Sequence, residues 1–212
     1  MKRWAAFVLV LVLAGCGGGK KSVAPPPVRS AQAPARGALP WPAPDDPMRL
    51  TRKAGLTPQT QEFVFLHVHV HVDVFVNGDT VTVPAGIGID VGNPAVRRFK
   101  APDGSTGYDG ISRPCAAPCI SPLHTHFDDG VLHTEAKENQ FNDLAEFFRE
   151  WNVRLSRNCV GGYCRPAAPI TVYVDGVPYK GDPRPIQLED GEEIAVVIGT
   201  PPGSIPSSFG GG

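Results

Sequence analysis

The sequence predicts an α+β domain, mostly β, in which one helix packs on an antiparallel sheet built from two similar β-hairpin units. Three observations lead to this class. Apolar residues alternate without a break over residues 63–76, a strand followed by an Asn-Gly or Asp-Gly turn occurs twice, and one amphipathic helix follows a capping box. A single globular domain is expected over residues 61–200.

The first 15 residues are expected to be a signal peptide. Lys2 and Arg3 precede an apolar stretch, and the segment Leu13-Ala14-Gly15-Cys16 resembles the lipobox of bacterial lipoproteins. The resemblance implies cleavage before Cys16 and attachment of acyl chains such as palmitate to it. Those chains would anchor the protein in the cell membrane or the outer membrane, outside the cytoplasm. A secretory signal with a chance cysteine is the alternative.

Residues 16–60 are expected to form a disordered tether, because they are rich in Pro and Gly and lack the apolar pattern of a core. A proline-rich ligand for a partner is the alternative for this segment. The tail over residues 201–212 is also expected to be disordered.

The strand over residues 63–76 is predicted to bury its even-numbered face, which runs from Val64 to Val76 and is entirely aliphatic. Asn77-Gly78 predicts a tight hairpin, with residues 80–83 as the return strand. Residues 170–176 repeat the pattern and end in Asp175-Gly176, and residues 193–198 form a further strand. The order hairpin, helix, hairpin is comparable with a β-grasp arrangement by analogy alone.

The segment Asp143-Leu144-Ala145-Glu146 has the form of a capping box, and the aromatic residues after it lie on one side of a helix, as core positions do. Residues 90–122 are expected to be a long loop. An even number of cysteines remains in the exported chain, which favours two disulfides over a zinc site with its usual two-residue spacers. Local pairing is favoured, Cys115 with Cys119 and Cys159 with Cys164.

All six histidines lie in two runs. On the first strand His67, His69 and His71 share one face with Asp73. Alternate residues of a strand lie about 6.6 Å apart, so only a neighbouring pair of these histidines can bind one ion. The remaining ligands must come from another segment.

The second run supplies them if Asp129-Gly130 forms a two-residue turn. Such a turn pairs His126 with His133 and His124 with Glu135, and places all four side chains on one face. Directly opposed Cβ atoms lie about 4.5–5.5 Å apart, close enough for two imidazoles to share an ion. A three-residue loop would instead turn His133 to the opposite face.

These residues predict a transition-metal site. Imidazole with carboxylate suits zinc, copper(II) or nickel, and the chain has too few methionines for a methionine-rich copper(I) site. The predicted ligands are His67, His69, His71, His124, His126 and His133. Asp73 and Glu135 are predicted to hydrogen-bond to ligands. Adventitious binding and a structural polar cluster are the alternatives.

The function predicted from these features is that of a lipid-anchored carrier or sensor of zinc or copper(II). An envelope module that binds a protein partner, and a metal-dependent enzyme, are the alternatives. The second run resembles the His-x-His-x-Asp-His motif of metallo-β-lactamases but has Asp129 at the last position, which excludes that family. Without its signal peptide the chain has 18 basic and 21 acidic side chains, which excludes a nucleic-acid partner.

Four segments resemble a group of exported bacterial and archaeal proteins without an assigned function. They are the histidine strand ending in Val76-Asn77-Gly78, residues 122–126, residues 130–135 and Phe147-Phe148-Arg149-Glu150-Trp151. The resemblance covers about residues 66–200. It implies a histidine-bearing domain and no particular reaction.

Overall fold

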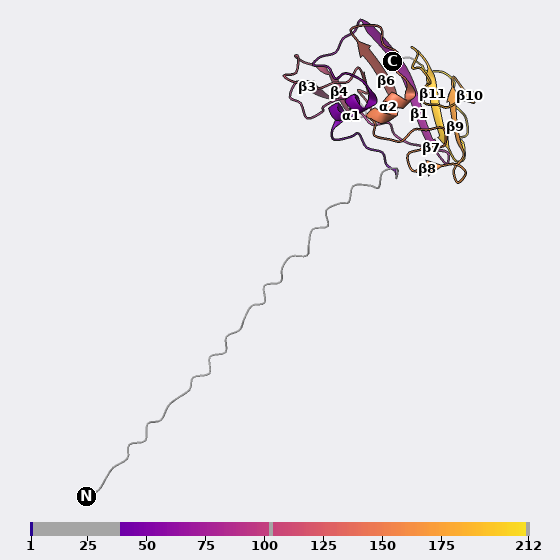
Figure 1. Cartoon of the computed structure of the whole chain (residues 1–212), viewed down its shortest axis with the longest axis horizontal. Coiled ribbons are helices and arrows are strands. Elements are labelled where there is room, and N and C mark those ends of the chain that lie inside the picture. Colours follow the sequence, from indigo (N-terminus) through magenta and orange to yellow (C-terminus); the bar gives the residue numbers. More distant parts are fainter. Residues whose placement is uncertain (2–38, 102–103, 211–212) are drawn as a thin grey trace. The chain divides into compact units, whose positions relative to one another are not determined.

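A seven-stranded mixed sheet contains most of the regular structure in the computed structural model of the chain (Figure 1). The structure describes residue 1 and residues 39–101 and 104–210. In these residues the elements, in chain order, are α1 (Pro47–Ala54), β1 (Leu66–Val76), β2 (Asp79–Thr80), β3 (Val96–Lys100), β4 (Thr106–Ile111), β5 (Leu123–His124), β6 (Val131–Ala136), α2 (Leu144–Glu150), β7 (Cys159–Val160), β8 (Tyr163–Cys164), β9 (Ile170–Val174), β10 (Val177–Tyr179) and β11 (Glu193–Ile198).

The strand order of the main sheet is β10-β9-β11-β1-β6-β5, with β2 paired to β1. The expectation of an antiparallel sheet is wrong in one place, because β1 and β11 run parallel, with His71 opposite Glu193 and Val76 opposite Ile198. The first long strand and the last strand therefore lie side by side at the centre. Parallel neighbours need a long crossover connection, and the whole chain between β1 and β11 provides it.

The two predicted hairpin turns, Asn77-Gly78 and Asp175-Gly176, both join antiparallel strands. Val76 pairs with Asp79 across Asn77-Gly78, and Val174 pairs with Val177 across Asp175-Gly176. All four turn residues have positive φ, from 48° to 92°, which is the backbone of a type I′ turn. The description of the two hairpins as similar units, and the β-grasp analogy, stay predictions.

The valine face of β1 is core, as its alternation predicts. Val70, Val72 and Val74 are at most 1% exposed. They pack with the aromatic residues of α2 in one large cluster, so that α2 covers this face of the sheet. The predicted strand begins too early in the sequence. The observed strand β1 begins at Leu66, and Val64, which was predicted to be buried, is exposed.

The capping box of α2 forms as predicted. The Asp143 carboxylate accepts from the backbone N–H of Glu146, and the Glu146 carboxylate accepts from that of Asp143, at 2.8 and 2.9 Å. Phe147, Phe148 and Trp151 are at most 1% exposed. Their burial fixes the helix on the sheet.

Residues 39–60 differ from the expected tether. They contain a second helix, α1, which begins at an Asp46 N-cap with Pro47 in its first turn and ends at Gly55 in the left-handed conformation. Trp41 and Leu50 are 5% and 1% exposed, so this segment is part of the folded core. The high proline content obscured a short helix whose apolar positions are few. The remainder of the predicted tether, with Cys16, and the predicted signal peptide after Met1 lie outside the described residues.

The tail also differs from the expectation. Ile205 packs against Phe75, Ala195 and Val197 on the sheet face opposite α2, and the Phe209 ring stacks on His71 with centroids 5.6 Å apart. This contact covers apolar residues that would otherwise face solvent.

Both predicted disulfides are present with local pairing, Cys115–Cys119 and Cys159–Cys164. The second closes the hairpin of β7 and β8, in which the two cysteines pair directly. Among the described residues, no helix combines the length and the apolar character that a membrane span requires.

Candidate metal centre

Three neighbouring strands bring histidines from both runs together. His69 of β1 lies opposite His133 of β6, and His133 lies opposite His124 of β5. In the next row, His67 lies opposite Glu135. Because directly paired residues project from the same face of a sheet, these side chains form one cluster. The spatial prediction that joins the two runs is thereby confirmed for His67, His69, His124 and His133.

The predicted turn between β5 and β6 is wrong in its length. His124, not His126, pairs with His133, because residues 125–130 all lie in the connection. Thr125 bonds instead with the segment before β3: its backbone N–H donates to the Ile87 carbonyl at 3.1 Å and its hydroxyl donates to the Pro84 carbonyl at 2.8 Å. A shift of two residues preserves the side-chain face, so the histidines still converge.

Gly88 makes this arrangement possible. Its φ is +73°, and a Cβ there would lie 2.5 Å from the Leu123 carbonyl oxygen. Only glycine allows the two backbones to approach so closely. This approach sets the position of β5 and of His124.

His124 and His126 face each other through their Nε2 atoms, which are 3.2 Å apart. The Nδ1 atom of His124 lies 2.9 Å from the Ser121 carbonyl oxygen, and that of His126 lies 2.5 Å from the Tyr108 carbonyl oxygen. A carbonyl only accepts, so each Nδ1 carries a proton, and each ring in its neutral form presents an Nε2 lone pair. Both rings are buried, at 1% and 8% exposure.

His133 lies at the middle of the cluster. Its ring centroid is 4.4 Å from that of His126, 4.6 Å from that of His69 and 5.7 Å from that of His124. Burial, reinforced by His126, lowers the pKa of His133 to about 3, and burial lowers that of His124 well below its usual range. Both rings are therefore neutral at pH 7, the form that binds metal.

Glu135 adds a carboxylate to this face. Its Oε1 lies 3.2 Å from Nε2 of His67 and 3.8 Å from Nδ1 of His133. Burial, followed by the nearby Glu62 charge, raises the pKa of Glu135 to about 7. Within the described residues, its Oε2 atom and Nδ1 of His133 are buried without a hydrogen-bond partner. Leaving such atoms unpaired is costly, and a bound cation would satisfy them.

Glu62 is a site residue that the sequence prediction missed. Its carboxylate forms a group with His124 and His126 in which all three ligand atoms lie within 4.8 Å of one another. Strand parity assigns Glu62 to the core face of β1, but β1 begins only at Leu66, and parity does not extend beyond a strand. The one feature of the sequence that pointed to Glu62 as a ligand is its position just before the strand that contains the first three histidines.

His71 stands apart from the other five histidines. Its Nδ1 lies 2.8 Å from Oε2 of Glu193, and its Nε2 lies 2.8 Å from the Asp129 carbonyl oxygen. The hydrogen bond to Glu193 raises the pKa of His71 to about 9, so the ring is a cation that donates from both nitrogens. In this state His71 and Glu193 form an ion pair between β1 and β11. Asp73 lies 3.8 Å from His71, away from the cluster of five.

Glu150 supports the loop that holds His124. The Ser121 hydroxyl donates to Oε1 of Glu150 at 2.6 Å, and the Ser121 carbonyl accepts from His124. The Thr51 hydroxyl lies 3.0 Å from both Oε2 of Glu150 and the Pro47 carbonyl oxygen. It has one proton, so if it donates to Pro47, Oε2 of Glu150 must carry a proton of its own. Burial raises the pKa of Glu150 to about 7, in agreement with this arrangement.

Replacing Glu150 by Gln is expected to remove a pH dependence of stability. A raised pKa means that the folded chain holds this proton more tightly than the unfolded chain. Ionising the buried Glu150 carboxyl therefore lowers the free energy of unfolding. This loss of stability is absent below pH 4.5, the ordinary pKa of a glutamate, grows as the pH rises and is complete above about pH 7. At pH 8 the Gln variant should be more stable by on the order of 3 kcal/mol, and near pH 4.5 the two chains should be equal. Urea denaturation at both pH values measures the difference; an equal gap at both would contradict the assignment.

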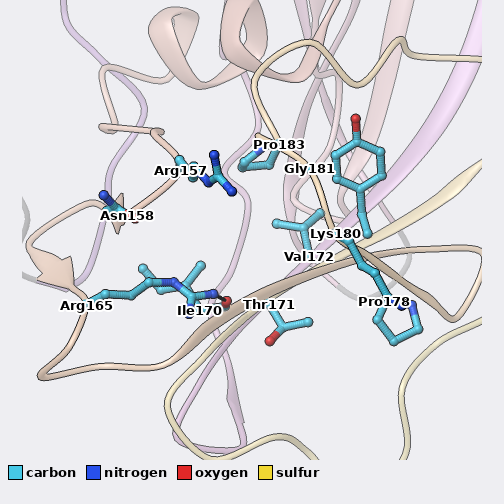
Figure 2. Close-up of a pocket in the computed structure, with 11 residues that line it drawn as sticks. Arg157, Asn158, Arg165, Ile170, Thr171, Val172, Pro178, Lys180, Gly181 and Pro183 are labelled. Carbon is cyan, nitrogen blue, oxygen red and sulfur yellow. Dashed lines mark hydrogen bonds between the residues drawn. The ribbon is translucent and has the colours of Figure 1, made fainter.

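A cavity of about 400 Å³ lies elsewhere, lined by residues of β9 and β10 and of the segments beside them. Figure 2 shows Arg157 and Arg165 on one side of it and Lys180 and Pro178 on the other. Arg165 donates to the Ile170 carbonyl. No histidine lines this cavity, which therefore is no part of the metal centre.

The comparisons with known proteins add no assignment. No protein-family model matches the chain, and neither the curated proteins nor the solved structures contain a significant match. The chemistry of the histidine cluster is therefore the basis on which a function is assigned.

Proposed function

We propose that this domain binds a transition-metal ion, zinc or copper(II), through the buried pair His124 and His126, completed by neighbouring imidazoles and carboxylates. The observation that carries the proposal is the pair of Nε2 atoms 3.2 Å apart. Two nitrogens bound to one tetrahedral zinc ion at about 2.0–2.1 Å are separated by about 3.4 Å. The apposed lone pairs repel each other unless a cation or a shared proton lies between them.

The hydrogen bonds of these rings support a metal over a shared proton. Ligand histidines in proteins usually donate their other N–H to a carbonyl or carboxylate, which fixes the tautomer and the ring. His124 and His126 both do so, through Ser121 and Tyr108. Burial also opposes a protonated pair, since it lowers the pKa of His124.

The number of donors favours a carrier or sensor over an enzyme. Catalytic zinc keeps a coordination position open, whereas a structural or transport site closes it with protein ligands. Glu62 forms one group with His124 and His126, and His133 and Glu135 form another with His126, each with its ligand atoms within 4.8 Å of one another. The pair therefore has three neighbouring protein donors, and a closed tetrahedral site needs only two of them.

The lipobox supports an exported protein anchored by lipid at Cys16. In that arrangement the proposed metal site lies outside the cytoplasm. The two disulfides of the chain are consistent with an oxidising compartment of that kind. Replacing Cys16 by Ser should move the protein from the membrane fraction to the soluble fraction of its host cells. Retention of the variant in the membrane fraction would argue against the lipid anchor.

Metal analysis of the untagged chain tests the binding proposal. After loading with zinc and dialysis, the natural chain should retain at least one ion, and the double variant His124→Ala, His126→Ala should retain one ion fewer. His71→Ala is the matched control, because it removes a histidine of the same strand system that lies outside the cluster and should leave the content unchanged. Equal zinc content in the natural chain and the double variant would refute the proposal.

A further inference from the structure

We propose that the cluster holds two metal ions, an inner ion bound by Glu62, His124 and His126 and an outer ion bound by His67, His69 and His133, with Glu135 bridging them. The proposal rests on the proposed function and extends it from one ion to two.

The cluster contains more ligands than one ion can use. Five imidazoles and two carboxylates meet here, and a tetrahedral ion takes four ligands. A single ion would bind four of the seven side chains. The other three, all in or beside the buried region, would be left without a cation to bind. Among the residues that the structure describes, Oε1 of Glu62, Oε2 of Glu135 and Nδ1 of His133 already lack a hydrogen-bond partner.

The donors divide into two groups that share no residue. His67, His69 and His133 form one, and Glu62, His124 and His126 form the other, each with its ligand atoms within 4.8 Å of one another. The first group has the pattern that the strands dictate, two alternate residues of β1 and the residue opposite one of them on β6. The second combines β5, the loop after it and the segment before β1.

Glu135 touches both groups. Its Oε1 lies 3.2 Å from His67 of the outer group, and it also belongs to a set with His126 and His133, one residue from each group. A carboxylate that binds one ion through each oxygen is compatible with the metal separation of about 3.5–4 Å found in two-metal sites. Counting Glu135 once for each ion, the seven side chains give each ion four ligands.

The two positions differ in access. The His67 side chain is 41% exposed, whereas His124 and His126 are 1% and 8% exposed. The outer ion therefore exchanges with solvent more readily than the inner one. Asp190 accepts a hydrogen bond from the His69 backbone at 2.9 Å and adds negative charge on the outer side, which favours a second dication.

Copper(II) alone, added to the untagged full chain, tests this arrangement. We expect two copper ions per chain by elemental analysis, and an electron paramagnetic resonance spectrum that is broadened or weakened by coupling between the ions. The double variant His67→Gln, His69→Gln should retain one copper with an ordinary, uncoupled spectrum. His71→Ala should keep both ions and the coupling.

Each other result overturns the inference in a distinguishable way. One copper per natural chain refutes the second ion and leaves the proposed function intact, whereas none refutes both. Two copper ions with uncoupled spectra, or loss of one in His71→Ala, would place the second ion at His71, Asp73 and Glu193 instead. The coupling is measured on the natural chain, so the result does not depend on the folding of a variant.

Discussion

Saturating zinc is expected to raise the free energy of unfolding of the full chain by about 4 kcal/mol when free zinc is ~1,000 times its dissociation constant. The candidate ligands come from β1, β5, β6 and the segments beside them, which meet only in the folded chain. Zinc therefore binds the folded state and shifts the equilibrium toward it. The metal also relieves the unpaired buried atoms of Glu135 and His133. Removal of zinc with a chelator should reverse the gain.

Chemical denaturation with and without zinc measures this effect. The double variant His124→Ala, His126→Ala should lose most of the gain, whereas His71→Ala should keep it even if its own stability is lower. The control matters because His71 forms an ion pair with Glu193, and its loss changes stability without changing the cluster. A stability that is the same with zinc and with chelator would contradict metal binding by the folded state.

Replacing Trp41 by Ala is expected to cost about 3–5 kcal/mol of stability, as for other buried aromatic residues. The Trp41 ring is 5% exposed and meets the Trp151 ring edge to face, with centroids 5.6 Å apart. It also lies directly against Gly161, where a Cβ would be 2.3 Å from the ring. The Trp41 carbonyl accepts from the indole N–H of Trp151 at 3.1 Å. The variant leaves this backbone bond in place, so it tests the packing.

Phe141→Ala is the matched control, because this aromatic side chain is 79% exposed and its loss should change stability by no more than about 0.5 kcal/mol. Urea denaturation of both variants gives the comparison. If Trp41→Ala is as mild as the control, residues 39–60 are not an integral part of the core, and the original expectation of a tether would be restored. The expected result makes α1 and Trp41 part of the domain that contains the histidine cluster.

Local patterns were enough to predict some features correctly. The alternation of β1 separates a valine face from a histidine face, since successive side chains of a strand point to opposite sides. The capping box around Asp143 places α2, and the short spacing of each cysteine pair leads to local disulfides. Each of these depends on residues close together in the chain.

The composition of residues 39–60 misled the prediction, because prolines are also compatible with a helix when one occupies its first turn, as Pro47 does in α1. The separation of His71 from the other five histidines could not be predicted, for a different reason. Its partner Glu193 comes from β11, which lies more than 100 residues away in sequence, and no local pattern places that strand beside β1.

The sequence by itself determined which side chains share a face within β1 and which share a face within β6, because alternation is a property of a single strand. Only the tertiary structure decided the register, in which His133 stands between His69 and His124. A slip of two residues keeps every side chain on its face, so the pattern of β5 and β6 is equally compatible with either pairing. Backbone bonds from Thr125 to residues 86–87 select one of them. Those bonds join segments about 40 residues apart, and they accompany the pairing of His124 with His133, beside which five imidazoles and two carboxylates form three overlapping groups.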